Sequence, residues 1–355
     1  MNGRTWAAVV LVVVVVGAGA GYSGYQLGLR AAGQGTLAAA SRSASPSADA
    51  RTTPGPVGTA STPPGGSPAV TPIHNAVVDG LHCKLPIYML GQQGSGAFIN
   101  FPSGAITADS SSSNLHVDGG GVDWFGLTYD NAVNRWLPVP STWVTPEGTL
   151  YAYALDLESH ATNFMIEVNA QTGTPSQLGG VGTGWQVIGM SSTTIYAEPI
   201  QGPGLWMQSI SGDFSPKLIN DDYWSAASGF YAYGSPIPDG GAILRMDVRN
   251  PTQRVPWFNK SNSAAIIGFV GSGDPVIWTG TDLWIASAPG QATRIGSGAL
   301  PLSPKASGRP IRGALAPVPD SHGLWFSTTD GIYLYAGGQT TKVSSLVAQV
   351  AGACR

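Results

Sequence analysis

From residue 84 onward, apolar and polar residues alternate in short runs separated by turns rich in Gly, Asp, Asn and Ser. A period of two is the pattern of half-buried β-strands, and no stretch after residue 74 shows the period of an amphipathic helix. An apolar residue followed by an aromatic one recurs in six of these runs, at Phe98, Tyr151, Tyr196, Tyr231, Trp278 and Trp325. The pattern therefore predicts an all-β domain built from a repeated unit.

The repeated unit has a nearly constant length. A second apolar run follows each of the six, and its second residue is Phe125, Met165, Trp206, Leu244, Trp284 and Tyr333, with spacings of 40, 41, 38, 40 and 49 residues. Weaker strand-like runs flank each pair, which brings the unit to four strands. Four strands every forty residues or so are typical of a β-propeller blade, so we predict six four-stranded blades. A seventh blade stays open because the first unit is irregular, and a pair of β-sandwiches is the alternative fold.

The N-terminal residues form a long apolar segment. Residues 6–29 carry no charge and include the run VVLVVVVV. As a helix they would span about 36 Å, enough to cross a bilayer core. Residues 1–30 are therefore either an uncleaved signal anchor with Arg4 inside, or a signal peptide cleaved near the small residues 18–20. Both alternatives place the rest of the chain outside the cytoplasm, on a single-pass membrane anchor or as a secreted protein.

Residues 31–73 consist almost wholly of Ala, Gly, Ser, Thr and Pro and contain no aromatic residue. Such a segment cannot bury enough apolar surface to offset its ordering entropy, so we expect a disordered linker, with a glycosylated stalk or wall-spanning spacer as the alternative. Residues 74–355 remain as the β-propeller domain. The net charge of −3 and the absence of any Lys or Arg run argue against a nucleic-acid partner.

The chain has two cysteines, Cys83 and Cys354, one near each edge of the predicted domain. In a ring the first and last blades are neighbours, so these thiols can meet despite their distance in sequence. We therefore predict a Cys83–Cys354 disulfide that closes the ring, which requires an oxidising compartment. Two unrelated free cysteines are the alternative.

Candidate ligand-binding residues are few. Trp143, Trp185 and Trp224 each stand at the start of a unit's innermost strand, where an indole could stack a sugar or grip a peptide, although packing between blades is the alternative. The acids Asp221 and Asp222 are adjacent in the connection into the fourth unit, where paired carboxylates could bind a cation or share a proton, or simply be solvated.

A metal site is a weaker candidate. Asp118 and Asp123 flank three glycines in a loop that could wrap a cation, but the acid spacing of a calcium-binding loop is missing. The five histidines are scattered at positions 74, 82, 116, 160 and 322, without metal-ligand spacing. No Gly-x-Ser-x-Gly elbow and no phosphate-binding loop is present. We therefore assign no catalytic residue and no cofactor.

Two stretches carry a family resemblance. Residues 126–140, GLTYDNAVNRWLPVP, resemble a Kelch-type hairpin, and residues 323–338, GLWFSTTDGIYLYAGG, look like blades of sensor-type and lyase-type bacterial propellers. Residues 83–160 as a whole resemble uncharacterised membrane-anchored, extracytoplasmic propeller proteins of bacteria. The regular double-glycine and Trp-Asp marks of Kelch and WD repeats are absent. The resemblance implies fold and location but no reaction, because propellers host many functions.

The sequence therefore favours a membrane-tethered extracytoplasmic propeller that binds a glycan, peptide or protein partner. The alternative is an extracytoplasmic propeller enzyme of the lyase or glycoside hydrolase class. That alternative needs a convergent acid and base, for which the sequence offers few His and Glu residues at equivalent blade positions.

Overall fold

A computed structural model describes most of residues 73–355. The internal residues outside the description are 90–94, 114, 116–126, 155–164, 179–184, 200–201, 211–214, 236–241, 262, 301–304, 307–308 and 311–314. The apolar segment 1–30 and nearly all of the linker 31–73 also lie outside the described residues. Among the residues that are described, no helix is long and apolar enough to cross a membrane.

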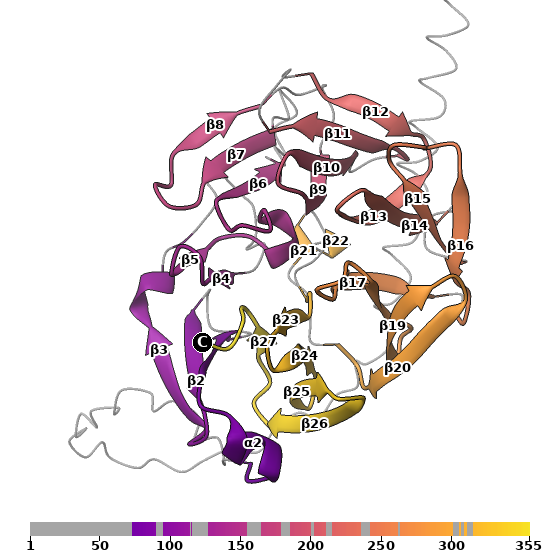
Figure 1. Cartoon of the computed structure of the whole chain (residues 1–355). Helices are drawn as coiled ribbons and strands as arrows, with labels where there is room; N and C mark the ends of the chain where they lie inside the picture. The colour runs from indigo at the N-terminus through magenta and orange to yellow at the C-terminus, as the bar shows by residue number, and fades with distance from the viewer. Residues whose placement is uncertain are drawn as a thin grey trace, which may run out of the picture. The chain divides into compact units, whose positions relative to one another are not determined.

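The domain is a six-bladed β-propeller, as the repeat predicts (Figure 1). The first blade, from its innermost to its outermost strand, is β27 (Gln349–Val350), β1 (Lys84–Tyr88), β2 (Gly96–Asn100) and β3 (Ala105–Asp109). The second has three strands, β6 (Leu150–Ala154), β7 (Met165–Asn169) and β8 (Pro175–Gln177). A single bridge from Val144 to Tyr151 stands where its innermost strand would lie.

The remaining four blades have four strands each and follow the chain order from the centre outward. The third is β9 (Trp185–Met190), β10 (Thr194–Pro199), β11 (Leu205–Ser209) and β12 (Lys217–Asn220). The fourth is β13 (Tyr223–Ser228), β14 (Tyr231–Ser235), β15 (Ile243–Asp247) and β16 (Arg254–Phe258). The fifth is β17 (Ala265–Phe269), β18 (Pro275–Trp278), β19 (Asp282–Ala288) and β20 (Gln291–Ser297). The sixth is β23 (Val318–Asp320), β24 (Gly323–Thr328), β25 (Gly331–Ala336) and β26 (Gln339–Ser344).

Two small hairpins stand apart from the blades. The strands β4 (Thr128–Asp130) and β5 (Arg135–Leu137) pair with each other between the first and second blades. The sequence pattern assigned this run to the first blade, and that assignment is wrong, because the C-terminal strand β27 supplies the blade's fourth strand instead. A second hairpin, β21 (Lys305–Ala306) with β22 (Arg309–Pro310), lies in the insertion between the fifth and sixth blades.

The expectation of no helix after residue 74 is wrong in one detail. Helix α2 (Ala76–Gly80) precedes the first blade, and the Asn75 side chain caps it by accepting hydrogen bonds from the backbone N–H groups of Val77 and Val78. An Asn at the N-cap satisfies donors that the first turn leaves unpaired. Two short 3₁₀ turns, η1 (Ser110–Ser112) and η2 (Ser141–Trp143), complete the regular structure described.

The hydrophobic core lies between neighbouring blades, because a blade presents apolar side chains on both of its faces. Trp224 of the fourth blade packs with Ile188 and Tyr196 of the third in one such cluster. The innermost strands approach so closely that a Cβ on Gly189 would lie 2.0 Å from the carbonyl oxygen of Ala227. Only glycine fits at this point of the ring.

The outermost strands follow one another around the rim, so that the end of one lies near the start of the next. Asn220, at the end of β12, donates its side-chain amide to the Pro251 carbonyl at 3.4 Å, just before β16. The Thr340 hydroxyl of β26 donates to the Ile295 carbonyl of β20. These contacts tie the edges of adjacent blades together.

Candidate functional site

The two ends of the strands differ in the connections they carry. At one end, which we call the short-turn end, the first strand of a blade leads to the second and the third to the fourth. Most of these links are tight turns, as at Gly229–Phe230 and Pro289–Gly290, but residues 210–216 separate β11 from β12. At the opposite end, which we call the long-connection end, the second strand of a blade ends and the third begins, and one blade ends and the next begins. Some intervals between described strands are short here, as at residues 329–330 between β24 and β25, whereas the intervals 155–164 and 298–317 are long for such links.

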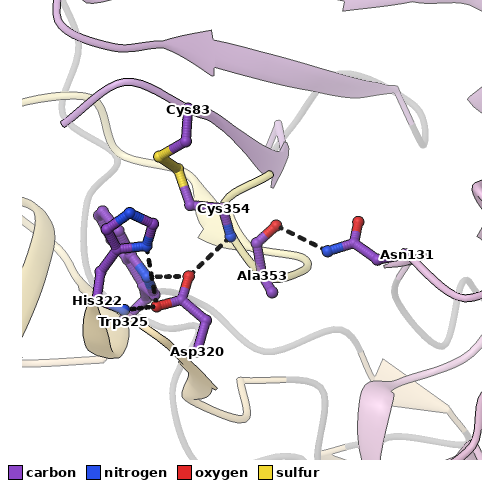
Figure 2. Close-up of a disulfide and its surroundings, with 7 residues drawn as sticks. All are labelled: Cys83, Asn131, Asp320, His322, Trp325, Ala353 and Cys354. Carbon is purple, nitrogen blue, oxygen red and sulfur yellow. Dashed lines mark hydrogen bonds and ion pairs between the residues drawn. A yellow bond between two sulfur atoms is a disulfide. The ribbon is translucent and has the colours of Figure 1, made fainter.

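The ring is closed by a disulfide at its short-turn end. The Cys83 and Cys354 sulfurs are 1.98 Å apart, and the two Cα atoms are 5.5 Å apart across a sequence separation of 271 residues. Both cysteines are 8% exposed and belong to the core cluster between the last and first blades. The predicted closure is confirmed, because β27 pairs with β1 and the bridge lies directly beside this pair (Figure 2). We call this junction of the last and first blades the seam.

Asp320, the last residue of β23, holds the C-terminal segment against the sixth blade. Its carboxylate accepts hydrogen bonds from the Trp325 indole at 2.7 Å, the His322 backbone N–H at 2.7 Å and the Cys354 backbone N–H at 2.9 Å. Figure 2 shows Asp320 below the disulfide with these donors around it. The side chain is 6% exposed, so a buried carboxylate with three donors is a structural anchor here.

The imidazole of His322 lies against the same carboxylate. Its Nδ1 is 3.3 Å from Asp320 Oδ1 but makes no hydrogen bond, and its ring meets the Trp325 ring edge-on at 6.2 Å. The two groups form an ion pair only when the imidazole is protonated. His322 lies in the β23–β24 turn, as the sequence indicates.

Arg355 forms a second contact across the seam. Its guanidinium carbon lies 4.3 Å from the centre of the Tyr129 ring and 4.9 Å from that of Phe98, and its Nη1 donates to Asn134. Tyr129 also meets Trp136 edge-on at 5.2 Å. A cation over two aromatic rings is attracted by their negative faces, so Arg355 joins the C-terminal segment to the first blade and the β4–β5 hairpin.

Burial and charge shift pKa values around this contact. Burial raises the pKa of the Tyr129 phenol, and the nearby Arg355 charge opposes the rise. For Asp109 burial would also raise the pKa, but hydrogen bonds from Ser111 and Trp136, together with the Arg355 charge, hold it below its usual value. Asp109 thus stays ionised as the partner of the buried Trp136 indole, whose Nε1 is 3.0 Å away.

The three predicted tryptophans lie where the sequence places them but are covered. Trp143 ends η2 just before Val144, Trp185 begins β9, and Trp224 is second in β13, with exposures of 1%, 2% and 1%. Trp185 meets Trp206 edge-on at 4.9 Å, and Trp224 donates to the Asn220 side chain at 3.0 Å. All three pack between blades in this structure, and a ligand-binding role for them stays a prediction.

The two acids of the predicted pair have different surroundings, and a binding role for them stays a prediction. Asp221 is exposed, whereas Asp222 forms an ion pair with Arg254 of β16, with Nε 2.9 Å from Oδ2. This ion pair links the third blade to the fourth at the rim. The candidate metal ligands Asp118 and Asp123 lie outside the described residues. Across the parts of the domain that are described, no group of three or more His, Cys, Asp or Glu side chains could hold a metal ion.

Other carboxylates are similarly engaged. A hydrogen bond from Arg249 lowers the pKa of Asp247 to about 2, and the two side chains lie 2.6 Å apart. Hydrogen bonds from Thr328, Tyr333 and Lys342 lower the pKa of Asp330 to about 2. Asp282 pairs with Arg294 at 2.7 Å. These acids hold turns and neighbouring strands in place, so their charges are balanced within the fold.

Sequence reasoning missed Asp320 and Arg355. The signal for Asp320 was its position five residues before Trp325, a spacing that lets a carboxylate at a hairpin turn reach an indole on the next strand. Asn220 reaches Trp224 in a similar way, four residues on. Arg355 carried no local signal, because its partners are more than two hundred residues away in sequence.

Comparisons with known proteins assign no family to the chain. No protein-family model and no curated protein matches it. Among solved structures it is similar to a nidogen/laminin complex, with TM-score 0.44, 10% identity, and coverage of 76% of this chain and 96% of that one. It is similar to TolB from Acinetobacter baumannii, with TM-score 0.45, 12% identity, and coverage of 76% and 66%. It is also similar to virginiamycin B lyase from Staphylococcus aureus, with TM-score 0.40, 13% identity, and coverage of 78% of this chain and 88% of that one.

Proposed function

We propose that residues 74–355 form a non-catalytic interaction module that is displayed outside the cytoplasm and binds a protein partner. The N-terminal segment 1–30 tethers it to the membrane through the linker 31–73. The long-connection end of the ring is the binding face. The observation that carries this proposal is the covalent closure of the ring at the opposite, short-turn end, by the Cys83–Cys354 disulfide.

The disulfide supports an extracytoplasmic location, because structural disulfides persist in oxidising compartments and are rare in the reducing cytosol. The apolar N-terminal segment supports the same location independently. These two features lie in different parts of the chain and depend on different physical properties.

The contacts that close the ring lie at the short-turn end, and this supports binding at the long-connection end. The short-turn end holds the disulfide, the Asp320 anchor and the Arg355 contact, all of which serve closure. Binding residues are usually carried on loops that a rigid scaffold positions, and the long links leave the strands at the other end.

Five of the described carboxylates are engaged within the fold, which favours a binding module over an enzyme. Asp222, Asp247, Asp282 and Asp330 each pair with a cationic side chain, and Asp320 accepts three hydrogen bonds. A general acid or base must be able to exchange its proton with a substrate. Carboxylates that balance a partner within the fold are poorly suited to that task.

Site-specific photocrosslinking in cells tests the binding face. A photoreactive amino acid replaces Asp221 or Thr281, which are exposed at the long-connection end, or Gln171 or Pro289, which are exposed at the short-turn end. We expect a discrete crosslinked protein from the first two positions and none from the last two. Equal crosslinking from both ends contradicts the assigned face. Binding to glycans without any crosslinked protein contradicts a protein partner.

Localisation is tested separately by fractionation of cells that produce the full chain. We expect the protein in the membrane fraction, reactive with a membrane-impermeant reagent, and with the residues of segment 1–30 retained. Recovery from the cytosol would contradict display outside it. A mature N-terminus near residue 21 in the medium would support the cleaved, secreted alternative.

A further inference from the structure

We propose that the seam acts as a mechanical clamp, in which the disulfide divides a pull on the N-terminal segment between the first and the last blade. This proposal rests on the proposed tethering, because a tethered module that binds a partner is pulled through its N-terminal side.

The chain enters the domain over the last blade. The Asn75 side-chain amide donates to the Lys342 carbonyl of β26 at 3.1 Å. The side chains of Val78 and Leu81 are 1% and 4% exposed and belong to the core cluster between the last and first blades. A pull on residue 73 therefore acts first on α2, which has only one turn.

Once α2 has detached, the pull reaches Cys83, which directly precedes β1. Strand β1 is held by five residue pairs to β2 and by two to β27. Without the bridge, extraction of β1 would break these ladders in sequence and would leave β27 in place on the last blade. The first blade alone would carry the load.

With the bridge, the load on Cys83 passes through the sulfurs to Cys354. The backbone N–H of Cys354 is bonded to Asp320 of β23, and that of Val350 is bonded to the Ser327 hydroxyl of β24 at 3.0 Å. Both acceptors belong to the last blade. Strands β1 and β27 must then leave together, and contacts with both blades break in the same event.

The backbone of Arg355 couples the two strands further. Its N–H donates to the Lys84 carbonyl at 3.1 Å, and its carbonyl accepts from the Lys84 N–H at 2.8 Å. Together with the bridge at the preceding residue, these bonds fix the ends of the two strands as one unit. After reduction, only these hydrogen bonds and the β1–β27 pairs transmit force toward Asp320, so the Asp320 contact carries less of the load.

Optical tweezers on the full chain test this dependence. One handle is attached enzymatically at residue 1 and the other in the exposed Pro289–Gly290 turn, so that no cysteine is modified. The measured quantity is the lifetime of the folded ring at constant force, with and without reductant. We expect reduction to shorten the lifetime at least roughly tenfold, the factor expected when one hydrogen bond to a charged group is lost.

The Asp320→Asn variant separates load bearing from ordinary stabilisation. We expect it to shorten the lifetime roughly tenfold in oxidised protein and to have little effect in reduced protein. The matched control is Asp247→Asn, which removes an acid on the fourth blade and leaves the seam unchanged. Reduction after folding in the trap avoids dependence on cysteine variants that fail to fold.

Equal lifetimes for oxidised and reduced protein would overturn the proposal. So would an Asp320→Asn effect of the same size in both redox states, because that result means that Asp320 stabilises the last blade without carrying load through Cys354. Neither result depends on where the chain resides in the cell, so a failure of the clamp is distinguishable from a failure of the proposed tethering.

Discussion

The backbone N–H of Cys354 lies 2.9 Å from Oδ2 of Asp320, so the residue that forms the disulfide to the first blade is also bonded to the last blade. One residue therefore joins both sides of the seam, covalently on one side and by a charge-assisted hydrogen bond on the other. This relationship makes the closure of the ring testable residue by residue.

Mass spectrometry of the unreduced protein should detect a Cys83–Cys354 crosslinked peptide. The double change Cys83→Ser with Cys354→Ser should lower the free energy of unfolding by about 2–5 kcal/mol, because the bridge closes a very long loop in the unfolded chain. Denaturant unfolding with and without reductant measures this change. Two free thiols in the folded protein would contradict the closure.

Asp320→Ala should lower the free energy of unfolding by about 2–4 kcal/mol, because it leaves three donors near the seam without an acceptor. Asp320→Asn keeps one acceptor oxygen and should cost less. Chemical denaturation monitored by tryptophan fluorescence measures both. Equal effects of the two variants would show that the number of acceptors at Asp320 is unimportant.

Arg355→Ala should cost about 1 kcal/mol through loss of the cation–π contacts with Tyr129 and Phe98. Arg355→Lys should lower the free energy of unfolding by less than Arg355→Ala, because lysine keeps the positive charge but lacks the planar guanidinium. Thermal unfolding of the oxidised protein provides the measurement. Arg249→Ala, which removes the guanidinium 4.4 Å from the exposed Phe230 ring, is the matched control and should have a smaller effect.

Gly189→Ala should lower the free energy of unfolding by about 2–3 kcal/mol, because the added methyl would overlap the Ala227 carbonyl of the next blade. The control is Gly271→Ala, where nothing lies within 4 Å of the added atom. Denaturant titrations of the two variants provide the comparison. If both substitutions prove neutral, the innermost strands are farther apart than described.

Alkaline titration should show late ionisation of three tyrosines. Burial is the largest cause that raises the pKa of Tyr196, Tyr233 and Tyr333 to about 12, above the usual value near 10. Because the pKa is raised in the folded state, the contribution of these phenols to the free energy of unfolding is fully present below about pH 10 and is lost as the pH rises toward 12. Ultraviolet absorbance of tyrosinate should therefore rise in two stages, with these three residues ionising near pH 12 or when the protein unfolds. Each of the variants Tyr196→Phe, Tyr233→Phe and Tyr333→Phe should reduce the late stage.

Much of the fold is readable from the sequence because each blade is a local structure. The alternation around Tyr196 and Trp206, or around Trp325 and Tyr333, sets the hairpins β10–β11 and β24–β25 without reference to distant residues. The closure was also predictable, because a ring makes neighbours of its first and last units and the chain has only two cysteines.

The first blade and the seam contacts were harder to predict for a physical reason. The run around Tyr129 has the same alternation as a blade strand, yet among the described strands it pairs with β5, because β3 already pairs with the outer edge of β2 and β27 with the edge of β1. The pairing of Arg355 with the Tyr129 ring depends on the same long-range arrangement. The local sequence pattern cannot show which of two strand-like runs pairs with a given strand edge, because tertiary packing decides this.

The pairing of β27 with β1 also constrains how the protein is made. A nascent chain that leaves the ribosome, or that is exported in an N-to-C direction, exposes the open edge of β1 until residues 349–350 arrive. During that interval the unfinished edge is available to chaperones and proteases. Loss of the last few residues, by premature termination or trimming, would leave the molecule permanently in that vulnerable form.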